Sequence, residues 1–284
     1  MIKNILKKIF LNKFKSIFFM LQNSKSDFLE IKDISFLIKK KTPLGLKNSV
    51  LYSRSDLTIT PNLLKNGQWD YFIIDFIKKY KKKLNYDFID VGANIGLITR
   101  QLILKKIKIS NFHCIEPEKN NFLLLKKNLE DFKKEKIFFY NIALVPNNKN
   151  LKKIFINKNN FGDFSLIKQN KNSKSINIHI KNVNTFLKKI IHQKNIKNII
   201  YKSDIQGMDE MVALSIDKQI QDKIKIIILE ITNIKYLNKE LEKFLNFASK
   251  FPIMYDENNT KLNLMTIKER IKTNKNFNLL LAKL

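Results

Sequence analysis

The stretch DFIDVGANIG, residues 87–96, decides the fold of this chain. Its first half is a short apolar run typical of a strand, and its second half is a turn that leads into a helix predicted over residues 94–107. Gly92 lacks a Cβ and would let the backbone approach a ligand closely. Asn94 is a suitable cap for the helix, and Gly96 would permit close contact between helix and sheet.

Apolar runs alternate with amphipathic segments along the rest of the chain. Strands are predicted over residues 85–91, 111–115, 136–142, 196–204, 223–231, 251–255 and 277–282, and two more over 152–157 and 175–180 around a polar loop. Helices are predicted over residues 118–132, 183–192, 208–216 and 236–250. This alternation indicates βαβ units. The predicted fold is therefore α/β, with a doubly wound, seven-stranded, mostly parallel sheet.

The N-terminal part fits this pattern poorly, so residues 1–65 are predicted to form an extension and residues 66–284 the α/β domain. Residues 1–23 carry apolar side chains at helical spacing with lysines between them, which predicts a basic amphipathic helix. It would pack on the domain or on a second subunit of a homo-oligomer. The alternative is peripheral contact with an anionic membrane surface. No run of about 18 apolar residues, the length of a spanning helix, is present.

The chain is strongly basic, with 54 Lys and Arg against 25 Asp and Glu and a net charge of +29. An anionic partner and a compositional bias toward Lys, Asn and Ile both account for this charge. We favour the bias and do not expect a nucleic acid partner, because the lysines are spread along the chain and arginine is rare. The single cysteine, Cys114, allows no internal disulfide and fits the cytoplasm. Three scattered histidines give no metal-binding spacing.

An acidic residue follows the turn at the sequence separation that is typical of a ribose-binding carboxylate. Glu116 lies 20 residues beyond Gly96, at the end of the next predicted strand, where a carboxylate can bind both hydroxyls of a ribose. The third glycine of the dinucleotide fingerprint is missing, which disfavours a nicotinamide oxidoreductase. Asp90 at the start of the turn would repel pyrophosphate but suits the cationic end of S-adenosylmethionine. An adenosine-containing ligand, and S-adenosylmethionine in particular, is therefore expected.

These motifs resemble those of the FkbM family of methyltransferases. The matching stretches are DVGANIG (residues 90–96), IEP (115–117) with Asn128, NIA (141–143), NFGDFSL (160–166), KSDIQG (202–207) and LEI (229–231). The resemblance covers roughly residues 66–255. One position departs from the family, which commonly has Glu two residues after the last motif glycine, where this chain has Asp209 followed by Glu210.

The resemblance implies a class I methyltransferase fold and methyl transfer from S-adenosylmethionine. The acceptor would most often be a hydroxyl oxygen of a sugar, a glycan or a secondary metabolite. The candidate cofactor residues are Asp90, Gly92, Asn94, Gly96 and Glu116, with Asn141 and Ser165 in loops near the adenosine.

Three charged residues are candidates for catalysis. Asp204 follows the fourth strand of the predicted domain and is the preferred base or substrate-orienting group. Lys202 should face the other side of a regular strand, and Glu230 is a second acidic candidate. Two alternatives stay open: an RNA-directed methyltransferase, although no RNA-binding module is recognisable, and a catalytically inactive adenosine-ligand-binding module at the membrane surface.

Overall fold

The computed structural model describes residues 28–31, 51–54, 58–146, 153–156, 174–232, 234–273 and 275–283. The helix predicted over residues 1–23 and the candidate residue Ser165 lie outside these ranges. The division of the chain at residue 65 stays a prediction. No helix in the described ranges is long and apolar enough to cross a membrane.

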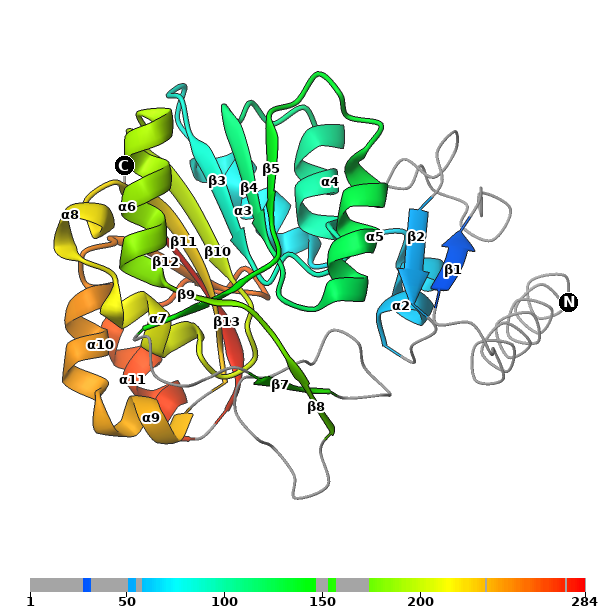
Figure 1. Cartoon of the computed structure of the whole chain (residues 1–284). Helices are drawn as coiled ribbons and strands as arrows, with labels where there is room; N and C mark the ends of the chain where they lie inside the picture. Colours follow the sequence, from blue (N-terminus) through cyan, green and yellow to red (C-terminus); the bar gives the residue numbers. More distant parts are fainter. Residues whose placement is uncertain are drawn as a thin grey trace, which may run out of the picture.

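The core of the fold is a seven-stranded sheet with the order β12-β13-β11-β10-β3-β4-β5 (Figure 1). Five neighbouring strands are parallel: β3 (Asp87–Val91), β4 (Asn111–Ile115), β5 (Ile137–Tyr140), β10 (Ile199–Ser203) and β11 (Ile224–Ile231). β13 (Phe277–Ala282) runs antiparallel to both β11 and β12 (Ile253–Asp256). This topology confirms the predicted doubly wound sheet and matches the class I methyltransferase fold that the resemblance implied.

Helices cover both faces of the sheet (Figure 1). One apolar cluster joins three helices to strand residues such as Phe88: α3 (Tyr71–Tyr80), α4 (Leu97–Leu104) and α5 (Lys119–Leu129). The other cluster joins the remaining large helices to alternate strand residues such as Ile89: α6 (Val183–Lys194), α7 (Asp209–Ser215), α10 (Leu241–Ala248) and α11 (Leu264–Lys272). Because successive strand residues point to opposite faces, the apolar strands are buried on both sides.

Smaller elements surround this layered core. α2 (Ile59–Asn66), α3, α11 and the short α8 (Lys218–Gln221) were not predicted. The helix predicted over residues 236–250 is two helices, α9 (Ile234–Lys239) and α10, which meet at Glu240. Three strand pairs lie outside the central sheet: β1 (Phe28–Ile31) with β2 (Leu51–Arg54), β6 (Ala143–Val145) with β9 (Ile180–Asn182), and β7 (Lys153–Ile156) with β8 (Lys174–Asn177).

The chain reverses its direction of travel across the sheet between β3 and β10. From β3 it proceeds outward through β4 and β5, and then crosses back to place β10 on the other side of β3. Ligands of open α/β sheets bind at such a switch point, beyond the carboxyl ends of the strands. The turn after β3 and the loop after β10 are therefore the place to look for a site.

Candidate ligand-binding site

Gly92 allows the turn after β3 to touch the end of β10. Its φ is +73°, and a Cβ at this position would lie 1.9 Å from the carbonyl oxygen of Asp204. The amide of Asp204 in turn donates to the carbonyl of Val91 at 3.0 Å. Any other residue would strain the backbone and separate the two loops, so glycine is required here.

Two roles predicted for this turn are wrong. Asn94 does not cap α4, because the N-cap is Gly96 and no side chain caps this helix end. The Asn94 side chain instead leaves its Oδ1 atom buried and without a hydrogen-bond partner in the described part of the chain. Gly96 makes room for α5 rather than for the sheet, since a Cβ there would lie 2.8 Å from Cδ1 of Leu125.

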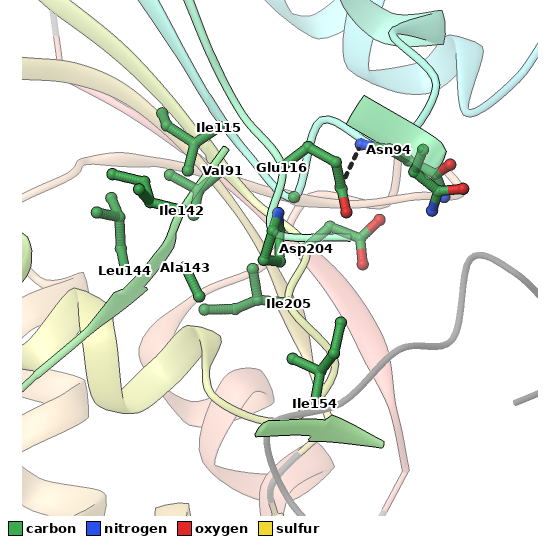
Figure 2. A pocket seen from close by; sticks show the side chains of 13 residues that line it. Val91, Asn94, Ile115, Glu116, Ile142, Ala143, Leu144, Ile154, Asp204 and Ile205 are labelled. Atoms are coloured by element: carbon green, nitrogen blue, oxygen red, sulfur yellow. Dashed lines mark hydrogen bonds between the residues drawn. The ribbon is translucent and has the colours of Figure 1, made fainter. Parts of the chain in front are cut away.

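Glu116 follows β4 and lies across from this turn. Its Oε2 accepts from the amide of Asn94 at 2.8 Å, and its Oε1 accepts from the amide of Glu118 at 2.9 Å (Figure 2). Only 5% of the residue is exposed. Burial raises the pKa of Glu116 to about 8 and outweighs the two amide hydrogen bonds, which lower it. Each carboxylate oxygen accepts a single amide and keeps a lone pair for a ligand.

A first cavity opens between Glu116 and the β6 segment. It holds about 550 Å³, counting the part open to solvent. Apolar side chains form most of its wall, among them Val91, Ile115, Ile142, Leu144, Ile154 and Ile205. Figure 2 shows this apolar wall on the side away from Asn94, with Ile154 of β7 at the opposite end from Ile115. The cavity thus offers a mostly apolar slot beside the Glu116 carboxyl group.

Asp90 and Lys202 form a buried ion pair beneath the turn. Nζ of Lys202 lies 3.1 Å from Oδ1 of Asp90 and donates to the carbonyl of Gly92 at 2.8 Å. Oδ2 of Asp90 accepts from Thr99 at 3.0 Å. Asp90 is fully buried and lines neither of the two cavities beside the turn. Its charge is therefore met by a lysine of the chain itself, and its predicted contact with the cofactor stays a prediction.

A second cavity, more polar than the first, adjoins it at Gly92, Asn94 and Asp204. It holds about 850 Å³, again counting open solvent. Three carboxyl groups and one lysine line it: Asp70, Asp204, Glu230 and Lys202. The structure thus gathers all three predicted catalytic residues at one cavity.

Gln206 joins two of these carboxyl groups. Its Nε2 donates to Oδ1 of Asp204 at 3.0 Å and to Oε2 of Glu230 at 2.7 Å. Burial, and next the negative charge of Asp204, raise the pKa of Glu230 to about 10. Glu230 is therefore protonated at neutral pH. The Asp204 side chain is 33% exposed.

Asp70 and Trp69 belong to this cavity but were missed by sequence reasoning. Asp70 precedes α3 in a left-handed conformation with φ +40° and ψ +47°, and its side chain does not cap that helix. Burial, and then the charge of Asp204, raise its pKa to about 6. The sequence signal was an aspartate just before an amphipathic helix, which predicts a cap rather than a site.

The remaining motif residues position the loops. Nδ2 of Asn141 donates to the carbonyl oxygens of Glu116 at 2.8 Å and Pro117 at 3.0 Å, so it braces the Glu116 turn and lines neither cavity. Asp209 accepts from the Ser203 hydroxyl and from the amide of Ile205. Glu210 accepts from the amide of Thr232 at 2.8 Å. The two adjacent carboxylates thus support two different loops, after β10 and after β11.

Comparisons with known proteins give similarity of fold only. No family model and no curated protein sequence matches the chain. An S-adenosylmethionine-dependent methyltransferase from Clostridium acetobutylicum is 11% identical, with 75% of this chain and 90% of that chain covered and a TM-score of 0.39. An O-methyltransferase from Bacillus cereus in complex with SAH is 10% identical, with coverages of 88% and 95% and a TM-score of 0.35. Precorrin-6y C5,15-methyltransferase from Geobacter metallireducens is 11% identical, with coverages of 74% and 86% and a TM-score of 0.35. Likeness at this level carries no argument about activity.

Proposed function

We propose that this protein is an S-adenosylmethionine-dependent methyltransferase that methylates a hydroxyl oxygen of a sugar, a glycan or a secondary metabolite. The observation that carries the proposal is the Glu116 carboxylate, held by two backbone amides at the mouth of an apolar slot. A carboxylate with two free lone pairs matches the paired hydroxyls of a ribose, and the slot beside it matches an adenine ring.

The residues of the first cavity fit this cofactor on three grounds. The missing Cβ of Gly92 lets the turn after β3 contact the Asp204 backbone at the wall that both cavities share. The buried Oδ1 of Asn94 is an acceptor that a ligand donor such as an ammonium group would satisfy. Asp204 lies where the two cavities meet and supplies negative charge there. When bound, S-adenosylmethionine supplies an electrophilic methyl group on a positively charged sulfur.

The second cavity would hold the acceptor. A hydroxyl oxygen is a weak nucleophile, so a base that removes its proton as it attacks helps the reaction. Asp204 is our choice for that base, because it is partly exposed and lines both cavities. Burial alone would lower the pKa of Lys202, but the charges of Asp90 and Asp204 outweigh burial and raise it. Lys202 therefore stays protonated and would orient groups rather than accept a proton.

Several residues that carry the resemblance to the FkbM family also hold this site together. Asn128 donates to the carbonyl of Ile95 at 2.8 Å, and Asn141 braces the Glu116 turn. These contacts support membership of the chain in that family, which we include in the proposal.

Calorimetric binding of S-adenosylmethionine, S-adenosylhomocysteine and NAD to the wild type and to Glu116→Gln tests the proposal. We expect the first two ligands to bind and NAD not to bind. The Glu116→Gln change should weaken binding about 10- to 100-fold, which is the effect of losing charge-assisted hydrogen bonds. Glu242→Gln, at an exposed glutamate on α10, is the matched control. Preferential binding of NAD, or equal affinity in Glu116→Gln, would overturn the proposal.

A further inference from the structure

The second cavity is acidic although the protein as a whole is strongly basic. The chain carries a net charge of +29, yet among the described residues this cavity is lined by the carboxylates of Asp70 and Asp204 and by protonated Glu230, with Lys202 as their basic partner. Nζ of Lys202 lies 3.1 Å from Asp90, outside the cavity, and 3.9 Å from Asp204. One lysine charge is thus shared between carboxylates, and the described lining keeps a net negative charge. The lining of the cavity is thus opposite in charge to the protein as a whole.

The turn that positions Asp70 is held by hydrogen bonds from helix α4. Gln101 of α4 is fully buried and holds the Trp69 peptide at both ends: its Oε1 accepts from the Trp69 amide at 3.1 Å, and its Nε2 donates to the Trp69 carbonyl at 2.7 Å. This clamp supports the left-handed backbone of Asp70, which a residue with a Cβ seldom adopts. A non-glycine residue held in such a conformation is strained and often marks a functional position.

The charge of Asp70 is directed at the cavity rather than at the helix that follows. An aspartate before a helix usually accepts from the first-turn amides, but Asp70 makes no such bond. The charge of Asp204 raises the pKa of Asp70, whereas the charge of Lys202 and the neighbouring Trp69 side chain lower it. Asp70 therefore adds negative charge to the lining of the second cavity, beside Asp204 and Lys202.

We infer that Asp70 is a specificity-determining residue that makes the acceptor end of the site reject anions, so that the acceptor is a neutral or amine-bearing hydroxyl compound. The inference rests on the proposed function for the identity of the reaction, but its electrostatic basis does not. Bringing a phosphate or carboxylate beside the carboxylates of Asp70 and Asp204 is unfavourable, because like charges repel. A phosphorylated or uronic acid acceptor, and the RNA backbone, are excluded on this ground, whereas an ammonium group gains a partner.

The single tryptophan of the chain reports on this cavity. Trp69 is the only tryptophan, it is half-buried, and it lines the cavity next to Asp70. Quenching of its fluorescence by iodide, caesium and neutral acrylamide therefore measures the sign of the local charge. After normalisation to a free tryptophan amide, we expect caesium to quench more strongly than iodide. Asp70→Asn should lower the caesium-to-iodide ratio by about twofold or more. Asn suits the same backbone conformation, so the variant should fold.

Asp75→Asn is the matched control, because it removes the same charge from an exposed position of α3 that does not line the cavity. Its ratio should stay near that of the wild type. A wild-type ratio in favour of iodide would overturn the inference without any variant. The same fluorescence follows titration with glucosamine, glucose and glucuronate in protein saturated with S-adenosylhomocysteine. We expect the tightest binding for glucosamine and the weakest for glucuronate, and the reverse order would also overturn the inference.

One further comparison separates an acceptor role from a cofactor role. If Asp70 instead stabilised the positively charged sulfur of the cofactor, Asp70→Asn would weaken binding of S-adenosylmethionine about tenfold and leave the affinity for S-adenosylhomocysteine unchanged. That result would overturn the inference. We expect both affinities to stay within about twofold of the wild type. Failure of the proposed function looks different, because wild-type protein would then bind neither compound whatever the quenching ratio.

Discussion

Lys202 and Asp90 are paired in register on neighbouring parallel strands, and 3.1 Å separates Nζ from Oδ1. The pair lies beneath the turn that carries Gly92, whose carbonyl also accepts from Lys202. Lys202 was predicted to face the other side of the strand from Asp204, and this is wrong, because residues two apart on a strand point to the same side. Nζ of Lys202 is 3.9 Å from Oδ2 of Asp204. One lysine thus links the turn after β3 to the loop after β10.

Removing the lysine should destabilise the protein strongly. Lys202→Met leaves Asp90 buried with Thr99 as its remaining hydrogen-bond partner, and breaking a buried ion pair typically costs about 3–5 kcal/mol. Urea unfolding of the variant measures this loss. The double variant Asp90→Asn, Lys202→Met should recover part of it, because no lone charge is then buried. Lys197→Met, at an exposed lysine, controls for the substitution itself. A loss below about 1 kcal/mol for Lys202→Met would contradict the ion-pair assignment.

Gly92→Ala should abolish ligand binding. The new Cβ would lie 1.9 Å from the Asp204 carbonyl oxygen, so the two loops must separate or the strand ends must shift. Gly67→Ala controls for strain, because Gly67 also has a positive φ but ends α2 outside both cavities. It should cost only about 1–2 kcal/mol of stability and leave ligand affinity intact. Calorimetry with S-adenosylhomocysteine compares the two variants, and wild-type affinity in Gly92→Ala would refute the close contact.

Ligand affinity should rise with pH through the titration of Glu116. In the ligand-free protein burial raises its pKa to about 8, so at lower pH the group is largely protonated. A ligand that donates two hydroxyl hydrogens to the carboxylate must first displace that proton. As the pH rises toward 8, the dissociation constant of S-adenosylhomocysteine should therefore fall by up to about tenfold per pH unit. Above pH 8 it should become constant. In Glu116→Gln the dissociation constant should no longer change with pH between pH 6 and 8. A pH dependence that persists in this variant would assign the titration to another group.

Glu230 should make the protein less stable as pH rises. Its pKa is raised from 4.5 in the unfolded chain to about 10 in the fold, so the folded state holds a proton that the unfolded state releases. Stability from this group is complete below about pH 4.5 and declines as pH rises toward 10. Glu230→Gln removes the decline. Between pH 5 and pH 9 the stability of Glu230→Gln relative to the wild type should therefore increase by about 1 kcal/mol or more, measured as the free energy of unfolding. A difference that is constant across this range would mean that Glu230 is not held protonated.

Sequence patterns predicted the central sheet well because its signals are local. The strands over residues 111–115 and 277–282 were predicted with the observed bounds, since each is a mostly apolar run. α11 was missed although Asn263 and Thr266 form a capping box, because its composition is polar and its buried residues are Ile267 and Ile271 alone. The break at Glu240 was also missed, since helical periodicity continues through residues 236–250 and only tertiary packing separates the two helices.

The candidate site was predicted where its residues lie at strand ends: Glu116 and Asp204 directly follow β4 and β10, and Glu230 is the last residue but one of β11. Asp70 was missed because it comes from a turn far from the motif in sequence, and only the fold brings it to Lys202. The roles of Asn94 and Gly96 were misjudged for a related reason. Both depend on contacts made across the turn, with Glu116 and with α5, that sequence spacing does not show.

Asp209 and Glu210 should prove to support separate loops. Asp209→Ala removes the acceptor of the Ile205 amide, and Glu210→Ala removes that of the Thr232 amide. Each loss should cost about 1–3 kcal/mol, because a buried donor is left without its partner. Hydrogen exchange read at single amides should show faster exchange at Ile205 only in the first variant and at Thr232 only in the second. Asp209→Glu, which introduces the residue common at this position in the FkbM family, should still destabilise the protein by about 1–3 kcal/mol, because the site is fully buried and shaped for the shorter side chain. Faster exchange at both amides in both variants would show instead that the two carboxylates act as one unit.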